Sequence, residues 1–330
     1  MKILAINPGS TSTKLAIYED GKQVWAGGAH HDLNEIAHFH QTIDQYEYRK
    51  EFIVKRLKDE GIAMDFDAVM GRGGLLCPLK GGVYAVIADP VVVDEFQLKA
   101  RVSGVPGIKR ESIFHALNQK AVARRYAKSI GKKYEELNLI VVHLGGGISV
   151  GAHRKGLVID VNNALNGEGP ISPERAGTVP SEALATLCFS GKYTLNEVKK
   201  MLHGKAGLAA YLGTSDMITI EEKAIEGKEP YKTLVAAMDY TVAKEIGAMF
   251  VALKGQCDAI ILTGGIAYSD YCVADIKEQI EYLCKVVVLP GENEMESLAE
   301  NAFGALTGEL PVLTYTGVSC AEEIPGMAEA

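Results

Sequence analysis

The chain has 330 residues, 47% of them hydrophobic, which is enough to build two medium-sized domains with full cores. Its formal net charge is −8 and no cluster of lysine and arginine is interleaved with aromatic residues, so small molecules rather than nucleic acids are the expected partners. Six irregularly spaced cysteines, no membrane-spanning apolar run and no signal-like N-terminus favour a reduced, cytoplasmic protein without a zinc site, a disulfide framework or a membrane anchor.

In chain order, the first elements predicted are three strands and a helix. Residues 2–18 predict a hairpin with the turn Gly9–Thr13, and a third strand is expected over 22–28. Asp32 is the expected N-cap of a long helix that ends at Gly61. Shorter strands follow over 66–71 and 83–88, with a helix over 118–130.

The second half of the chain begins with the same order of elements. A second unit of three strands is expected from Leu139, with a glycine-rich turn at 145–147. Further helices are predicted over 181–190, 194–203, 232–254 and 295–307, and inner strands over 258–263 and 286–289. The helix over 232–254 is apolar enough to be mostly buried. Residues beyond Val318 show no periodicity and predict a disordered tail.

Both hairpins have turns whose composition suits phosphate binding. In each, an apolar strand ends in a polar residue, Asn7 or His143, and the glycines and hydroxyl groups that follow let backbone N–H groups converge on an anion. The order of strand and then glycine returns at Gly264 and Gly265. One such turn alone can be an ordinary hairpin, and Gly9–Lys14 is not a Walker loop because it lacks the second glycine. Three in this order predict a duplicated fold that closes on a nucleotide.

These motifs belong to a larger set that runs through nearly the whole chain. The set comprises Asn7-Pro-Gly-Ser-Thr-Ser-Thr-Lys14, Gly71-Arg-Gly-Gly-Leu-Leu76, Asp89-Pro-Val-Val-Val-Asp94, Ser112-Ile-Phe-His-Ala-Leu-Asn-Gln-Lys120, His143-Leu-Gly-Gly-Gly147, Asp160-Val-Asn-Asn-Ala-Leu165, Pro173-Glu-Arg-Ala-Gly-Thr178, Tyr211-Leu-Gly-Thr-Ser-Asp216, Thr263-Gly-Gly265 and Pro290-Gly-Glu-Asn-Glu294. With these residues the chain resembles the acetate and butyrate kinase family, within the superfamily of actin-like, sugar-kinase and heat-shock ATPases.

The resemblance implies an α/β protein with the duplicated ribonuclease-H-like fold of the actin-like ATPases, two domains around a nucleotide cleft. Residues 1–137 with 295–318 would form the acyl and phosphate domain, 138–294 the nucleotide-binding domain, and 319–330 the disordered tail. Family members carry a helix with the motif Glu-His-Ala-Ser-Asn-Leu-Gly beside the acyl site. Here Tyr84 is followed almost at once by Asp89, so we expect a reduced wall of the acyl pocket.

The resemblance also implies roles for single residues. Arg72 is expected to meet the substrate carboxylate and Arg175 the transferring phosphoryl group, because the planar guanidinium pairs with two oxygens at once. His115 is expected to hydrogen-bond the phosphoryl oxygens, Asp89 to act beside them, and Asp89 and Glu294 to hold Mg²⁺. The residues expected to bind ATP or ADP are Asn7, Ser10, Thr11, Ser12, Lys14, His143, Gly145, Gly146, Gly147, Asp216, Gly264 and Gly265.

Several of these side chains also have a plainer structural interpretation. Arg72 can be a surface cation, and Asn7 can form a turn before a proline. His115 can be a partly buried core residue. Asp89 can be a turn residue before a proline, and Glu294 can complement the dipole at a helix N-terminus.

Three functions remain open from the sequence. The first is reversible phosphorylation of a short-chain carboxylate by ATP, with butanoate as the expected substrate and acetate, propionate or a branched-chain acid as alternatives, in a homo-oligomer. The second is a sugar or polyol kinase, which would need an aspartate base instead of the arginine pair. The third is a nucleotide-binding module without catalysis, for which ATP would bind without carboxylate-dependent release of ADP.

Overall fold

The computed structural model describes residues 1–9, 12–32, 35, 39, 42–74, 76–85 and 87–322. The chain divides into two compact units. The first comprises Met1–Gly74, Gly82–Pro90 and Asn293–Thr316, and the second comprises Leu75–Gly81, Val91–Glu292 and Gly317–Ala330. Helix α3 (Ala116–Ser129) packs within the second unit, and the domain boundary at 137 stays a prediction.

In the part of the chain that the structure describes, the first unit holds a seven-stranded sheet. Its order is β12 (Val312–Leu313), β5 (Val83–Tyr84), β6 (Ile87–Ala88), β4 (Ala68–Arg72), β1 (Lys2–Pro8), β2 (Ser12–Glu19) and β3 (Lys22–His30). The predicted hairpin and third strand are confirmed as antiparallel β1, β2 and β3. The prediction of one strand over 83–88 was wrong, because the chain reverses there and β5 pairs antiparallel with β6.

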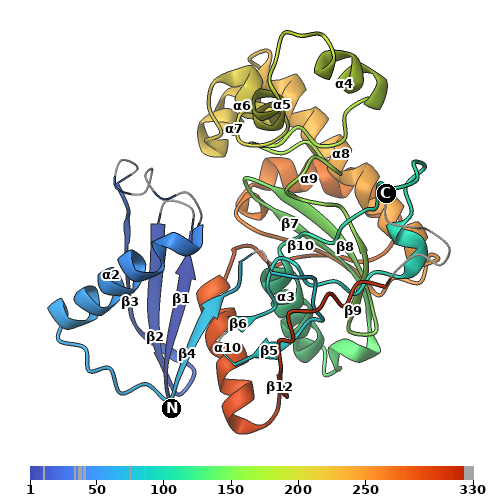
Figure 1. Ribbon diagram of the computed structural model, residues 1–330. Coiled ribbons are helices and arrows are strands. Elements are labelled where there is room, and N and C mark those ends of the chain that lie inside the picture. Colours follow the sequence, from blue (N-terminus) through green and yellow to red (C-terminus); the bar gives the residue numbers. More distant parts are fainter. Residues whose placement is uncertain are drawn as a thin grey trace. The chain divides into compact units, whose positions relative to one another are not determined.

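Helices cover both faces of this sheet, α2 (Tyr46–Asp59) on one and α10 (Glu294–Thr307) on the other (Figure 1). Leu57 of α2 is buried against Leu4 and Ile17 of the sheet. The prediction of one long helix was wrong over Thr42–Gln45, which form a 3₁₀ turn; threonine and aspartate are weak helix formers there. Its expected N-terminal part, including Leu33 and Ile36, lies mostly outside the described residues.

The second unit is built on a five-stranded sheet in the order β11-β10-β7-β8-β9. The bounds are β11 (Val286–Val288), β10 (Ala259–Thr263), β7 (Asn138–Leu144), β8 (Ile148–Arg154) and β9 (Leu157–Val161). The predicted second unit of three strands is confirmed as β7 to β9. The interpretation of β11 as an inner strand was wrong: β11 is an edge strand with half-buried side chains, and a short apolar run does not reveal which position in a sheet it takes.

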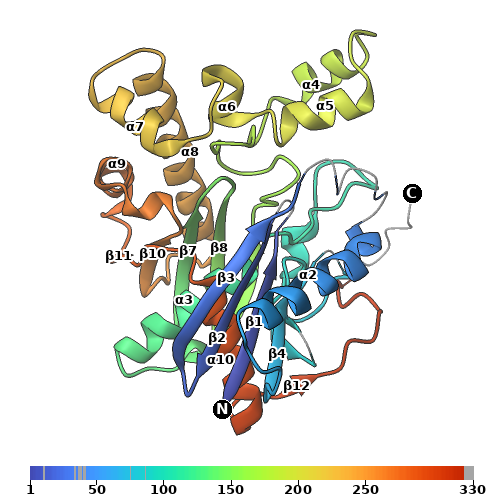
Figure 2. The same ribbon diagram turned by 90° about the vertical axis from the view of Figure 1, so that its left-hand side faces the viewer.

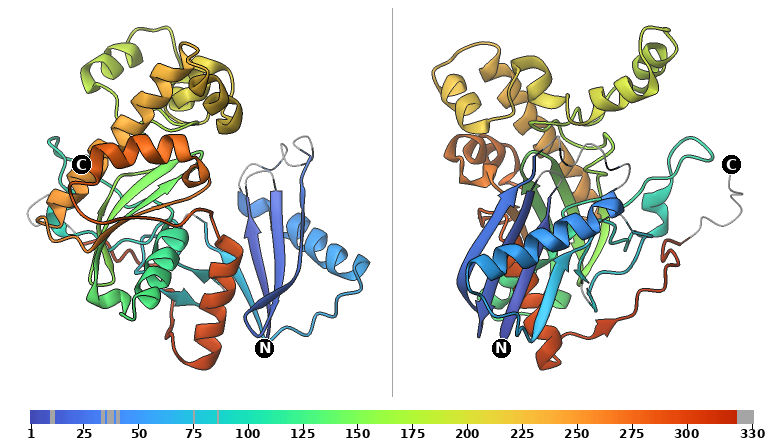
Figure 3. Two further views of the ribbon diagram at one scale, coloured as in Figure 1. Left: turned by 180° about the vertical axis from the view of Figure 1, so that it is seen from behind. Right: turned by 60° about the vertical axis from the view of Figure 1, so that its left-hand side comes forward.

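Helices α8 (Tyr231–Ala252) and α9 (Asp270–Ile280) cover one face of this sheet, and α3 covers the other (Figure 3). Four short helices gather beyond the ends of β7 and β8 (Figures 1 and 2). They are α4 (Ser181–Cys188), α5 (Leu195–Leu202), α6 (Gly207–Leu212) and α7 (Met217–Ile225). Further 3₁₀ turns are Leu98–Arg101, Tyr134–Glu136 and Ile266–Tyr268. Among the described helices, none is long and apolar enough to cross a membrane.

The beginning of the predicted disordered tail is tied to the second unit. The backbone N–H of Cys320 donates to the carbonyl of Pro78 at 2.9 Å, and its thiol lies 3.4 Å from the carbonyl oxygen of Asp94. Residues 323–330 lie outside the described residues, so disorder there stays a prediction. None of the six cysteines, all of which lie among the described residues, forms a disulfide, although the sulfurs of Cys257 and Cys284 lie 3.2 Å apart.

The buried helix α8 carries a carboxyl group that predicts a pH dependence of stability. Asp239 is fully buried, and burial raises its pKa to about 8, with the carboxylates of Asp275 and Glu221 adding to the rise. The folded protein therefore keeps a proton on Asp239 that the unfolded chain releases above about pH 4, so stability falls as the pH rises from 4 to 8.

We expect Asp239→Asn to remove this dependence. The free energy of unfolding of the wild type should fall between pH 5 and pH 8, whereas that of the variant should not. The difference between them should therefore shift by roughly 3 kcal/mol in favour of the variant, as measured by urea denaturation. The change with pH is diagnostic, because any cost of burying the amide is the same at both values. The control Asp270→Asn, at an exposed position beside the same helix pair, should show no such change. A pH-independent difference for Asp239→Asn would contradict the prediction.

Candidate active site

In the first unit, the predicted residues Asn7, Arg72 and Asp89 lie at the carboxyl ends of parallel strands. Ile6 of β1 pairs with Gly71 of β4, and Arg72 of β4 pairs with Ala88 of β6, in parallel registers. Asn7 and Asp89 each come one residue later on their strands. Parallel strands bring their carboxyl ends to one edge of a sheet, which is where ligands bind in open α/β sheets.

Glu294, the first residue of α10, joins this group. Its carboxylate accepts a short hydrogen bond from the side-chain amide of Asn7, and its Oε1 lies 3.3 Å from Nη1 of Arg72. The side-chain oxygen of Asn7 is buried without a hydrogen-bond partner. A buried amide oxygen left in this state is costly unless a donor or a cation reaches it, so this corner of the sheet can accept a positively charged or hydrogen-bonding group.

Asp89 follows the tight hairpin of β5 and β6. Val83 and Tyr84 pair with Ala88 and Ile87, so two short antiparallel strands lead directly to Asp89. Asp89 is buried, and its Oδ1 accepts a hydrogen bond of 2.7 Å from the backbone N–H of Gly82. Its backbone has a φ of 35°, which is strained for a residue with a side chain. The hydrogen bond from Gly82 therefore holds the carboxylate of Asp89 in place.

The remaining predicted residues of the first turn are only partly described. Ser10 and Thr11 lie outside the described residues. The carbonyl of Ser12 accepts a hydrogen bond from the N–H of Gly9 at 2.8 Å, and Lys14 is exposed on β2 opposite Asn7. The hairpin is confirmed, whereas its use for phosphate stays a prediction.

In the second unit, the turn of Gly145, Gly146 and Gly147 lies beneath the side chain of Arg175. A β-carbon on Gly147 would lie 1.5 Å from Nη1 of that arginine, so only glycine fits there. The carbonyl of Gly146 accepts a hydrogen bond of 2.7 Å from Oγ of Ser172. Nη1 of Arg175 donates to a backbone carbonyl at 2.5 Å, and burial lowers the pKa of its guanidinium without neutralising it. The structure thus brings a cation to the predicted phosphate turn.

His115 and His143 stack on each other, with ring centroids 3.9 Å apart and ring planes at 16°. Nδ1 of His115 lies 2.8 Å from Oγ of Ser149, and Nδ1 of His143 lies 2.8 Å from Oδ1 of Asn118. Nε2 of His143 lies beside the turn, 3.1 Å from where a β-carbon of Gly145 would stand. The two predicted histidines therefore form one structural unit with the turn.

Gly264 and Gly265 follow directly after β10, which pairs with β7. Gly264 exchanges backbone hydrogen bonds of 3.2 and 3.0 Å with Gly291, and it has a φ of 91°. Asp216 caps α7: its carboxylate accepts hydrogen bonds from the N–H of Ile218 and the hydroxyl of Thr219, and the Thr219 bond lowers its pKa. An exposed cap explains this aspartate without a ligand, so its contact with ribose stays a prediction.

Three buried polar residues of the site were not predicted individually. Asn118, Gln119 and Ser149 are each at most 1% exposed and all hydrogen-bond to the histidine pair or to each other. The signal was available, because an amide pair inside an apolar helix that begins directly after His115 is unusual.

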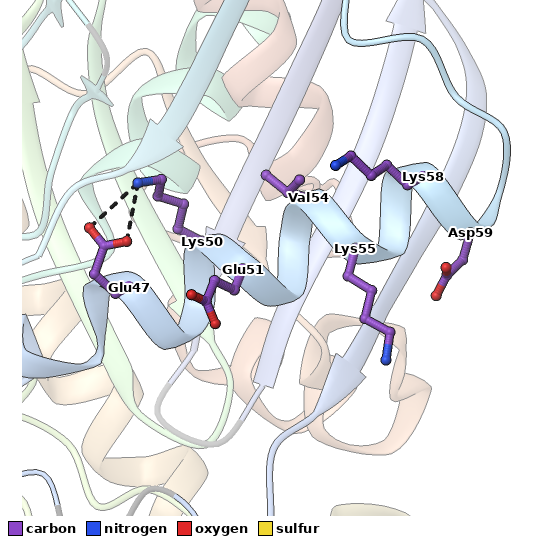
Figure 4. Close-up of a pocket in the computed structure, with 7 residues that line it drawn as sticks. All are labelled: Glu47, Lys50, Glu51, Val54, Lys55, Lys58 and Asp59. Carbon is purple, nitrogen blue, oxygen red and sulfur yellow. Dashed lines mark hydrogen bonds and ion pairs between the residues drawn. The ribbon is translucent and has the colours of Figure 1, made fainter.

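The pocket in Figure 4 is not the active site. It is a shallow surface on the exposed side of α2, lined by Glu47, Lys50, Glu51, Val54, Lys55, Lys58 and Asp59. Its lysine and glutamate side chains form a solvated helix face, with Lys50 and Glu47 paired at 3.1 Å, and it contains none of the predicted residues.

Comparison with known proteins decides the family. Residues 94–303, more than half of the chain, match the acetokinase family. The chain is 60% identical to a probable butyrate kinase from Phocaeicola vulgatus over 351 aligned residues, covering 96% of this chain and 99% of the relative. The chain belongs to the acetokinase family. It is also 49% identical to a probable butyrate kinase from Bacteroides thetaiotaomicron, covering 96% of this chain and 100% of that relative.

Similar solved structures confirm the fold. The acetate kinase of Porphyromonas gingivalis matches with a TM-score of 0.73 at 18% identity, covering 92% of this chain and 99% of that chain. A propionate kinase from Francisella tularensis matches with a TM-score of 0.71 at 17% identity, covering 91% and 98%. The predicted actin-like ATPase fold is therefore confirmed. The 351-residue alignment with the Phocaeicola relative is longer than this 330-residue chain, so that relative has residues that this chain lacks.

Proposed function

We propose that this protein transfers the γ-phosphoryl group of ATP directly to a short-chain carboxylate, converting butanoate and ATP to butanoyl phosphate and ADP, reversibly. The observation that carries the proposal is that each unit holds an arginine beside a predicted anion site, Arg72 at the strand ends of the first and Arg175 over the turn of the second. The two relatives named as probable butyrate kinases support butanoate.

The chemistry explains why two arginines are needed. Carboxylate and phosphate are both anionic, so the protein must neutralise charge while it holds the attacking and leaving oxygens in line. In our proposal Arg72 binds the carboxylate, Arg175 stabilises the transferring phosphoryl group and His115 donates a hydrogen bond to it. Gly145 to Gly147 cradle the nucleotide phosphates, and Gly264 and Gly265 approach the base and ribose.

The residues at the first unit's strand ends fit Mg²⁺. Glu294 supplies a carboxylate and Asn7 supplies the orphaned amide oxygen, and oxygen ligands are those that Mg²⁺ prefers. Among the described residues no three His, Cys, Asp or Glu side chains converge, which agrees with an ion that takes most of its ligands from phosphate and water. When bound, the ion would neutralise phosphate charge. Asp89 is the second proposed carboxylate.

The assay for the proposal traps acyl phosphate with hydroxylamine. Protein, ATP, Mg²⁺ and butanoate should form hydroxamate, and no product with intact ATP binding would favour the nucleotide-binding module. Acetate, propionate and isobutyrate belong in the same assay. Each buried CH₂ contributes about 0.8 kcal/mol, so an acyl wall missing at the β5–β6 hairpin should cost the three-carbon tail of butanoate roughly 2 kcal/mol of binding. That raises the KM for butanoate roughly thirtyfold over that with a complete wall and flattens the preference among the four acids.

Removing a metal carboxylate should change the metal requirement more than nucleotide binding. For Glu294→Gln and Asp89→Asn, we expect the Mg²⁺ concentration at half-maximal rate to rise severalfold, since a neutral amide is a weaker ligand than a carboxylate. ATP affinity in metal-free buffer, measured by calorimetry, should stay near that of the wild type. An equal loss in both measurements would point to misfolding and against metal binding.

We further propose a homo-oligomer, dimeric or larger, that acts in the cytoplasm, where ATP is supplied. Sedimentation equilibrium of the full chain tests the assembly. A monomer at the concentrations used for the assay would remove this part of the proposal and leave the chemistry unaffected.

A further inference from the structure

A chain of buried polar side chains runs through the second unit and ends at the histidine pair. The hydroxyl of Tyr134 lies 2.6 Å from Nδ1 of His153, Nε2 of His153 lies 2.9 Å from Oε1 of Gln119, and Nε2 of Gln119 lies 2.8 Å from Oγ of Ser149. Ser149 then contacts His115. Apart from the half-buried His115, every member is at most 4% exposed.

We propose that Gln119 and Ser149 are positioning residues that hold neutral His115 as the tautomer protonated on Nε2, and that Asn118 holds His143 as the opposite tautomer. The two stacked rings then have different tasks. His115 is a hydrogen-bond donor through Nε2, and neutral His143 offers Nε2 as an acceptor. The inference deepens the proposed function, because it rests on His115 facing the transferring phosphoryl group.

The orientation of the Gln119 amide is fixed by a backbone carbonyl. Its Nε2 lies 3.1 Å from the carbonyl oxygen of Ser149, which can only accept a hydrogen bond. The amide nitrogen must therefore face Ser149, and the amide oxygen faces His153. Consequently His153 donates through Nε2, and burial, which lowers the pKa of this imidazole well below its usual value, keeps His153 neutral.

The hydroxyl proton of Ser149 sets the tautomer of His115. The amide of Gln119 can only donate to Oγ of Ser149, so the hydroxyl proton points elsewhere. Nδ1 of His115, at 2.8 Å, is the acceptor in reach. If Nδ1 carried a proton, Ser149 would accept twice and leave its own buried O–H unused, which costs free energy. Nδ1 is therefore the unprotonated nitrogen, and the ring proton sits on Nε2.

The same reasoning gives the opposite result for His143. Nδ2 of Asn118 donates to the carbonyl oxygen of Glu292 at 2.5 Å, so Oδ1 of Asn118 faces His143 as an acceptor. Nδ1 of His143 therefore carries the proton. With ring centroids 3.9 Å apart, two imidazolium cations would repel each other, so the stacking disfavours a charge on both rings.

The direct test is ¹⁵N NMR of the full chain with labelled histidine side chains, assigned with His115→Gln and His143→Gln. At a pH where both rings are neutral, we expect the Nε2–H form for His115 and the Nδ1–H form for His143. The reverse pattern, or averaged signals for both rings, would overturn the inference. This readout needs no turnover, so it separates this inference from the proposed function.

Ser149→Ala tests the consequence for catalysis. We expect His115 to lose its single tautomer and kcat to fall about tenfold, the equivalent of one net hydrogen bond, while the KM values for ATP and butanoate change less than twofold. The matched control is Ser112→Ala, which removes another buried hydroxyl of the same unit, bonded to the carbonyl of Val93 at 2.7 Å. Equal losses in the two variants, or an unchanged His115 spectrum in Ser149→Ala, would contradict the positioning role.

Discussion

Replacing Arg175 by alanine is expected to lower kcat by about 10³-fold, with a much smaller effect on the KM for ATP. The guanidinium lies over the Gly147 turn, where the proposed reaction places the transferring phosphoryl group, and arginines that stabilise such a group account for factors of about 10³ or more. Steady-state kinetics in the hydroxamate assay measures the loss. The hydrogen bond from Arg175 to Ala164 holds the side chain in place before any ligand arrives.

Two further variants test whether the planar guanidinium of Arg175 itself is responsible for the loss. Arg175→Lys keeps the charge but loses the planar fork, so we expect it to recover only a small part of the rate. Arg154→Ala removes an exposed arginine of β8 and should leave kcat unchanged. A near-normal rate for Arg175→Ala would place this arginine outside the reacting centre and leave the phosphoryl group to other residues.

A large loss of stability is expected for Gly264→Ala. A β-carbon there would lie 2.3 Å from the carbonyl oxygen of Leu144, and the φ of 91° is itself unfavourable for alanine. The backbone strain contributes about 1–2 kcal/mol and the displaced strand end about 1–3 kcal/mol, so we expect a loss of roughly 2–5 kcal/mol in the free energy of unfolding. Urea denaturation followed by circular dichroism measures it.

The neighbouring residue is a matched control. Gly265 has a φ of −66°, and a β-carbon on it would meet nothing within 4 Å. Gly265→Ala should therefore stay within about 0.5 kcal/mol of the wild type. If both alanine variants were equally stable, the close approach between β10 and β7 could not be a rigid feature of the fold.

Much of the fold and part of the site could be predicted from the sequence. Apolar strands around glycine-rich turns predicted β1–β2 and β7–β8, because hairpins depend on residues that are close in the chain. That Asn7 and Arg72 lie at one edge of the sheet was not predicted, because it depends on the parallel register of β1 and β4, which are distant in the chain. The resemblance to the acetokinase family supplied their roles, which periodicity alone does not give.

The features that escaped prediction depend on contacts distant in sequence. The edge position of β11 follows from how its unit is assembled, and the hairpin that closes the gap before Asp89 depends on pairing between β5 and β6. The packing of Arg175 onto Gly147 joins residues 28 positions apart along the chain. Asn118 and Gln119 belong to one of the motifs noted in the sequence. Their hydrogen bonds to His143 and Ser149 could not be predicted, because those partners lie elsewhere in the chain.

The contact between Gly147 and Arg175 has a consequence for how such sequences diverge. A side chain at position 147 cannot coexist with the guanidinium in its present place, so the first step away from glycine would displace the arginine before any other change could compensate. The two positions should therefore be inherited together. In descendants that keep the fold but lose phosphoryl transfer, selection would cease to maintain both Gly147 and Arg175. A substitution at one position would then indicate that the other is no longer maintained.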